Sequence, residues 1–200
     1  MKEANKKETI LTTKAVHCGE DAVKAKMKAI HPKLFGLFCP VKYRLLKKEK
    51  VLVPYMFIVF DYRVLRSKSE NLNKRKMLNR EGQIAIVFDM NEVHPFHFDL
   101  FDDLSLQKKN IEKTEGKILE CNCDEKEAVR RSMECASWQY LRRVFHTMPE
   151  ITIAKKVLFY REAYKLYLSC NGRTYEKYAY MDKFGLKNEH ISGLRVRLDV

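Results

Sequence analysis

Hydrophobic residues recur at helical spacing near the start of the chain. Val23, Met27 and Ile30 follow one another at intervals of four and three residues, and lysines occupy the positions between them. This spacing places the apolar side chains on one face of a helix. Pro32 ends the pattern, because proline disfavours a helical conformation in the residue before it. We therefore expect an amphipathic helix over residues 21–30.

A second helix is predicted over residues 125–146. Asp124 and Glu127 form a D-x-x-E capping box, in which the aspartate accepts a hydrogen bond from the first helical turn and the glutamate reaches back. Pro149 closes the segment. The apolar side chains that keep helical spacing across it are Val129, Met133, Ala136, Tyr140 and Val144.

Two β-branched and aromatic segments predict strands at 51–62 and 83–89, the second buried on both faces. Pro54 cannot donate to a strand ladder, so we expect it at an edge, at a strand start or in a bulge. The residues between these strands lack a strand pattern and carry many basic side chains. We expect a long basic hairpin loop at 63–82.

The strongest local signal is Asn171-Gly172, which lies between two segments rich in tyrosine. This dipeptide readily supplies the two positive φ angles of a type I′ turn. It predicts a tight β-hairpin in the last quarter of the chain.

The two halves of the chain follow a similar order of helix, aromatic strand and second strand. This similarity suggests an α+β protein of tandem helix-plus-β-hairpin units, with an antiparallel sheet and both helices packed on one face. The units would be residues 1–118, which include the basic loop, and 119–200, together forming one compact domain. The other face of the sheet would remain open for a partner.

Composition narrows the class of protein. Of the 200 residues, 46% are hydrophobic, which excludes a disordered chain. The longest apolar run is far shorter than the roughly 20 residues of a membrane-spanning helix, and the N-terminal segment does not resemble a signal peptide. Six scattered cysteines do not resemble a secreted disulfide framework. We therefore expect no membrane span and a cytoplasmic location.

The formal net charge is +13, and the positive excess lies mainly in the first and last quarters of the sequence. Such a charge favours nucleic acid or an acidic protein surface as a partner. A compositional explanation competes, because lysine outnumbers arginine two to one, as a low-GC genome would also produce. Sequence alone does not separate these explanations.

The function that best accommodates these patterns is non-enzymatic binding of an anionic partner through the basic loop and the sheet face. Phosphates would contact the cations, and exposed tyrosines would stack on bases. The competing interpretation is that the tyrosines pack across strands and the lysines are only solvated. The candidate contact residues are Arg66, Lys68, Lys74, Arg75, Lys76, Arg80, Lys42, Arg44, Tyr164 and Tyr178.

Three other functions stay open. A protein–protein adaptor or structural component would leave no motif, and Trp138 could anchor its interface. A metal site could use His94, His97 and Asp99, with Cys121 and Cys123 nearby in sequence, although their spacing does not match that of structural zinc sites. A nucleophilic cysteine at 39, 121 or 123 has the right chemistry but no identified base. The common phosphate-loop, dinucleotide and hydrolase motifs are absent, so no cofactor is predicted and an enzyme is the less favoured class.

Overall fold

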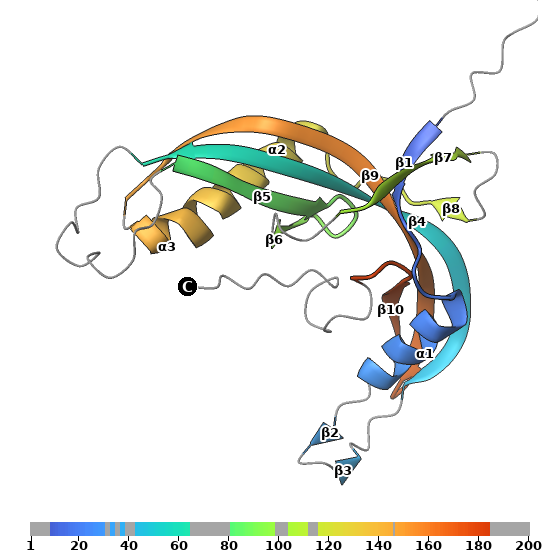
Figure 1. Ribbon diagram of the computed structural model, residues 1–200. Coiled ribbons are helices and arrows are strands. Elements are labelled where there is room, and N and C mark those ends of the chain that lie inside the picture. Colours follow the sequence, from blue (N-terminus) through green and yellow to red (C-terminus); the bar gives the residue numbers. More distant parts are fainter. Residues whose placement is uncertain are drawn as a thin grey trace, which may run out of the picture. The chain divides into compact units, whose positions relative to one another are not determined.

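The computed structural model is a mixed α+β structure containing an eight-stranded sheet (Figure 1). It describes residues 9–30, 33–34, 37–38, 43–64, 81–98, 104–111, 116–145 and 147–184. The predicted binding loop therefore lies largely outside the described residues. Within the described ranges, no helix is both long enough and apolar enough to cross a membrane.

The described helices and strands alternate irregularly along the chain. The strands of the sheet are β1 (Thr9–Thr13), β4 (Arg44–Arg63), β5 (Glu81–Asp89), β6 (His94–Phe98), β7 (Leu106–Asn110), β8 (Lys117–Ile118), β9 (Glu150–Cys170) and β10 (Arg173–Tyr180). A separate pair consists of β2 (Lys33–Leu34) and β3 (Leu37–Phe38). The helices are α1 (Gly19–Ile30) and α2 (Glu125–Glu134), which continues as the π-helix η3 (Cys135–Leu141) and then α3 (Arg142–Phe145).

These elements form two compact units. The first, which we call the α1 unit, draws on residues 1–54, 104–119 and 159–194. The second, the α2 unit, draws on 55–103, 120–158 and 195–200. Each unit combines distant parts of the sequence.

The core of the α2 unit lies between a helix and the antiparallel pair β4–β5. Ile58 pairs with Ile86 and Phe60 with Ile84, and all four side chains are at least 96% buried. The alternation of strand side chains directs this set to one face, where Ala136 and other residues of the helix pack on it. On the other side of β5, the short strand β6 completes the antiparallel ladder. The predicted strand at 83–89 is confirmed, and it is buried on both faces.

Pro54 lies within β4, between two separate ladders. Val51 and Leu52 pair with β8, and pairing with β5 begins at Tyr55. Neither ladder therefore uses the hydrogen-bond donor that proline lacks.

The start of α2 confirms half of the predicted capping box. The Asp124 carboxylate accepts a hydrogen bond from the Glu127 backbone N–H at 2.8 Å. The Glu127 carboxylate instead accepts from Arg130 and Arg131, and the hydrogen bond from Arg130 is the largest cause that lowers the pKa of Glu127 to about 2. Helical structure extends to Phe145, close to the expected end.

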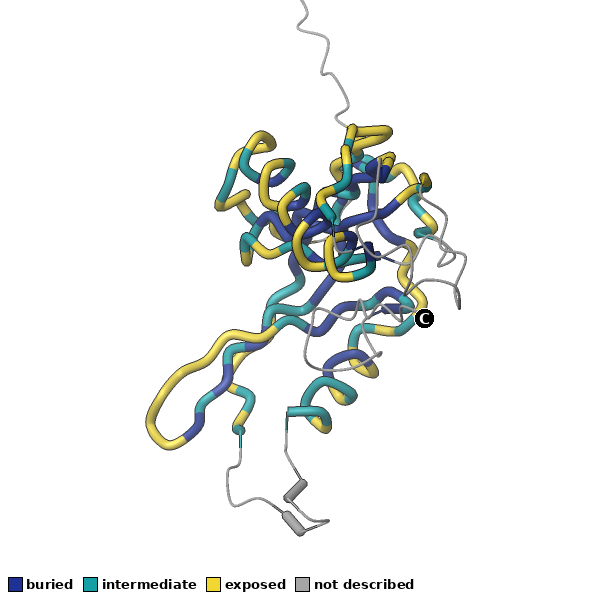
Figure 2. Tube along the Cα trace, turned by 90° about the vertical axis from the view of Figure 1, so that its left-hand side faces the viewer, coloured by how far each residue is buried: buried dark blue, intermediate teal, exposed yellow. Residues whose placement is uncertain are grey.

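The β9–β10 hairpin of the α1 unit confirms the predicted turn. Asn171 and Gly172 have φ angles of 50° and 75°, and Cys170 pairs directly with Arg173. Ala22 and Val23 of α1 pack on the face of this hairpin that carries Leu166. Residues 171–177 at the hairpin tip are all exposed and form a yellow run in Figure 2, whereas residues 166–170 of β9 are buried or half-buried and appear blue and teal.

The tandem repeat is not confirmed. The helix α1 packs on the hairpin β9–β10, whereas α2 and η3 pack on β4–β5. Each helix thus covers a hairpin from the other half of the sequence, although the prediction paired each helix with the hairpin that follows it. An arrangement with both helices on one face of the sheet is likewise not confirmed.

Candidate binding surfaces

Most of the predicted contact residues lie outside the described residues. These are Arg66, Lys68, Lys74, Arg75, Lys76 and Arg80 of the basic loop, together with Lys42. Arg44, Tyr164 and Tyr178 are described. Arg44 is exposed at the start of β4.

Tyr164 and Tyr178 lie on opposite faces of the β9–β10 hairpin. In the register, Tyr164 pairs with Ala179, and Tyr178 pairs with Lys165. Tyr164 packs against the α1 core, and a Cβ atom added at Gly19 would overlap its ring. The structure therefore does not bring these two tyrosines onto one surface.

The hairpin face that carries Tyr178 has its cations neutralised. Lys165 forms an ion pair with Glu176 at 2.8 Å, and Lys47 pairs with Glu49. Hydrogen bonds to these carboxylates are the largest causes that raise the pKa values of both lysines. Tyr167 donates its hydroxyl to Glu49 at 3.0 Å. This face combines tyrosine with lysine, as the sequence suggested, but its lysines already have acidic partners.

The face that carries α1 has a different charge pattern near the hairpin tip. Arg173, Tyr175 and Lys177 alternate along β10 and therefore share this face, and Tyr175 is 38% exposed. The rings of Tyr43 and Tyr175 meet edge to face at 5.8 Å. Lys48 lies over Tyr164 at 5.6 Å from the ring centroid. Among the described residues, Lys48, Arg173 and Lys177 form no ion pair. We call Tyr43, Lys48, Arg173, Tyr175 and Lys177 the tyrosine–cation patch.

Buried charges in the α1 unit form a closed network. Arg161 is 1% and Asp182 is 2% exposed. Their side chains meet through two hydrogen bonds, at 2.7 and 2.9 Å, and Thr13 donates to the same carboxylate at 3.1 Å. The Phe184 backbone N–H also donates to it, and the Tyr180 ring lies 3.8 Å from the guanidinium. Both oxygens of Asp182 are therefore occupied, which indicates a structural role.

The candidate metal ligands are not brought together. His94 and His97 stand three residues apart on β6, so they project to opposite faces of the strand. His94 contacts the ring of Phe96, and His97 stacks on Tyr140 at 4.6 Å. Asp99 lies outside the described residues. No cluster of three metal-ligating side chains occurs in the described ranges.

The cysteines of the nucleophile hypothesis are poorly activated. Burial raises the pKa of the Cys121 thiol and is the largest cause that raises the pKa of Cys123. The thiolate, which is the nucleophile, is therefore disfavoured at neutral pH. Cys39 lies outside the described residues. The arrangement gives no support to a catalytic thiol at Cys121 or Cys123.

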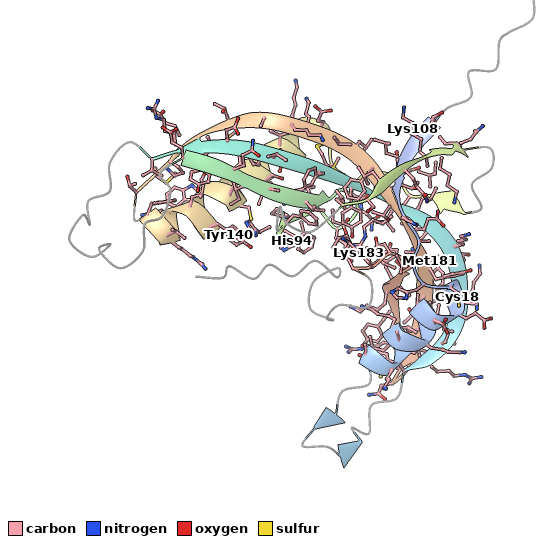
Figure 3. The ribbon with its side chains drawn as sticks, in the orientation of Figure 1. Cys18, His94, Lys108, Tyr140, Met181 and Lys183 are labelled. Carbon is pink, nitrogen blue, oxygen red and sulfur yellow. The ribbon has the colours of Figure 1, made fainter. Side chains whose placement is uncertain are left out.

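A pocket of about 480 Å³ opens beside η3 in the α2 unit. Figure 3 labels His94 on β6 and Tyr140 on η3, the strand and helix that border it. Trp138, the candidate interface anchor, lines the pocket and is 52% exposed. The π-helix that carries it was not predicted, because the apolar spacing of that segment is compatible with an ordinary α-helix. Arg131 and Gln139 also line the pocket.

A second pocket of about 420 Å³ lies at the ends of β4, β5 and β9. Its charged groups are largely occupied with one another. Arg63 pairs with Glu81 at 2.8 Å, and the Gln83 side chain donates to Asp61 at 2.8 Å. Because these polar groups already pair with one another, the lining of this pocket does not indicate one class of ligand.

Comparison with known proteins gives no indication of function. No family model, curated protein or solved structure matches the chain.

Proposed function

We propose that the protein is a non-enzymatic binding protein that contacts an anionic partner, either nucleic acid or an acidic protein surface. The observation that carries this proposal is the contrast between the two faces of the β9–β10 hairpin. On one face, Lys47 and Lys165 have carboxylate partners. In the tyrosine–cation patch on the other face, the cations lack such partners among the described residues.

Unpaired cations beside tyrosines suit an anionic ligand. Phosphates or carboxylates can approach Arg173 and Lys177 without displacing an ion pair to any residue that the structure describes. Tyr175 offers an exposed ring on which a base could stack. The basic loop that contains Arg66, Lys74 and Arg75 is a second candidate contact for an anionic partner. The net charge of +13 would add long-range attraction.

Single-stranded nucleic acid is the first partner to test. Labelled oligo-dT would be titrated at several salt concentrations with the parent protein and with the double variant Arg173→Gln/Lys177→Gln. We expect weaker binding by the variant and a log–log salt slope that is shallower by about 1.4, or about 0.7 for each phosphate that the variant no longer neutralises.

The matched control is Lys47→Gln/Lys165→Gln, which removes the same formal charge from the other face. We expect this control to bind nearly as well as the parent. Equal weakening by both double variants would show an effect of bulk charge only and would contradict the proposed patch.

Neutralising all six loop residues, Arg66, Lys68, Lys74, Arg75, Lys76 and Arg80, tests the other part of the interface. An unchanged affinity would remove the loop from the proposal.

An adaptor role is the second candidate, favoured by the large exposed side chain of Trp138. It predicts no salt-sensitive retention on oligo-dT. A stable protein partner that no longer binds Trp138→Ala, but still binds the Arg173→Gln/Lys177→Gln variant, would support it over the anionic-partner proposal.

A further inference from the structure

The pocket beside η3 has the size and the chemistry of a small-molecule site. Its volume of about 480 Å³ lies within the roughly 300–1,000 Å³ typical of ligand pockets. The side chains that line it and carry the argument are Val93, His94, Arg131, Trp138 and Gln139.

The π-helix presents an aromatic ring to this pocket. Cys135, Ala136 and Leu141 of η3 are buried, but Trp138 is 52% exposed. The Arg142 guanidinium lies 4.3 Å from the Trp138 ring centroid, in the range of a cation–π contact. π-helical turns frequently occur at functional sites. The segment thus combines a stacking surface with a positive charge.

Polar groups around the indole provide hydrogen-bond donors and acceptors. Arg131 lines the pocket and is anchored by Glu127 at 2.6 Å. Glu134 also lines it, but its carboxylate is paired with Arg130 at 2.5 Å. Gln139 and His94 add side chains that can donate and accept hydrogen bonds. The guanidinium of Arg131 and the carboxylate of Glu134 are thus already paired, and the positive charge beside the indole is that of Arg142.

The backbone at the pocket wall has an unusual conformation. Val93 has a φ of 55°, in the left-handed region that a β-branched residue rarely adopts. The preceding turn is organised by Asp89, whose carboxylate accepts from the backbone N–H groups of Asn91 and Glu92 at 2.9 and 2.8 Å. Strain of this kind is often found at ligand sites.

We propose that this pocket binds a nucleotide, with the base stacked at Trp138 and the phosphate held by Arg142 beside it. The planar base matches the exposed indole, and the phosphate matches the Arg142 guanidinium. The nucleotide is either free or part of a single strand. This site shares no residue with the tyrosine–cation patch, and nucleotide binding here would be a function additional to the one proposed above.

Trp138 is the single tryptophan in the sequence, so its fluorescence reports on the pocket directly. The parent protein would be titrated with AMP, adenosine, ribose 5-phosphate and oligo-dT. We expect saturable quenching by AMP and weaker binding of adenosine and ribose 5-phosphate, because each lacks one recognised group. Quenching by oligo-dT alone would identify the strand as the source of the nucleotide. Absence of a response to both AMP and oligo-dT would overturn the proposal.

Variants assign the binding to these residues. Arg142→Gln should weaken binding of the quenching nucleotide by about tenfold, as expected when a charge-assisted hydrogen bond is removed. Arg131→Gln should weaken it less, because that guanidinium is already paired with Glu127. Arg143→Gln is the matched control, because it removes the same charge from the next residue of the same helix while the guanidinium on the Trp138 ring is that of Arg142. Equal weakening by Arg143→Gln would overturn the proposal.

Calorimetry provides the readout for Trp138→Ala, which abolishes the fluorescence signal. We expect binding at least about fivefold weaker, the lower end of the effect of removing a base–aromatic stack. An unchanged affinity, in a variant with the parent's circular dichroism spectrum, would contradict the stacking role. Arg173→Gln/Lys177→Gln should leave AMP binding unchanged, so failure of the patch and failure of this pocket are distinguishable.

Discussion

Arg161 and Asp182 form a doubly hydrogen-bonded ion pair inside the α1 unit, with both side chains at least 98% shielded from solvent. Removing two charges from water is costly, and only good geometry and further hydrogen bonds offset that cost. Thr13 and the Phe184 backbone supply those hydrogen bonds. The pair therefore joins β1, β9 and the segment after β10 in one arrangement.

Replacing Asp182 with asparagine should destabilise the protein strongly. The variant preserves the shape of the side chain but leaves the Arg161 charge buried without a counter-ion, at a cost of about 3–5 kcal/mol. Urea unfolding followed by circular dichroism measures the change in the free energy of unfolding. Glu176→Gln, which breaks the more exposed pair with Lys165, is the control and should cost less than about 1 kcal/mol. Similar destabilisation in both variants would contradict this assignment.

The same pair should make stability depend on acid pH. Burial alone raises the pKa of Asp182, but the charge and hydrogen bonds of Arg161, together with the hydrogen bond from Thr13, outweigh it and leave the pKa below its ordinary value of 3.8. A lowered folded-state pKa stabilises the fold above pH 3.8, and this contribution disappears as the pH falls further. Urea midpoints of the parent and Asp182→Asn should therefore converge below pH 3.8. A constant difference across that range would refute the linkage.

Gly172→Ala should destabilise the hairpin through backbone conformation alone. Gly172 has a φ of 75°, and apart from its chain neighbours no described residue lies within 4 Å of the position that a Cβ would occupy. The left-handed conformation costs an L-residue about 1–2 kcal/mol, without a steric contribution from neighbours here. Thermal unfolding provides the measurement. Asn171→Gly, which keeps a residue that accepts positive φ, should change stability much less; a larger effect for Asn171→Gly would argue against this explanation.

Gly19→Ala should be destabilising because of Tyr164. The new methyl group would overlap the tyrosine ring at the first residue of α1. In a Tyr164→Ala background the overlap is absent, so the double variant should be more stable than the sum of the single effects by about 0.5–3 kcal/mol. Additive effects in this double-mutant cycle would mean that the ring moves aside freely.

Local features of the fold could be predicted because their cause lies within a few residues. Asp124 caps α2 through the backbone of Glu127, and Asn171-Gly172 sets the β9–β10 turn. The two-residue turn also fixes the register of β9 against β10. A correct prediction of the turn therefore also predicts that Tyr164 and Tyr178 lie on opposite faces of the hairpin.

Long-range relationships had no such signal. Thr13 and Asp182 are separated by 169 residues, and no pattern near either of them indicates the other. For the same reason the sequence did not show that α1 packs on β9–β10. The pocket was missed because it depends on the π-helix and on the turn at Val93, which have no distinct residue pattern.

The packing of α1 on β9–β10 has a consequence for synthesis. A ribosome releases the residues of α1 well before Leu166, Leu168 and Ala179, which cover its apolar side. Until those residues have been translated, Ala22 and Val23 cannot pack on the hairpin. The apolar face of the helix is then exposed and prone to aggregation or to association with other chains. Chaperone dependence during translation would accordingly be greatest before β10 leaves the exit tunnel.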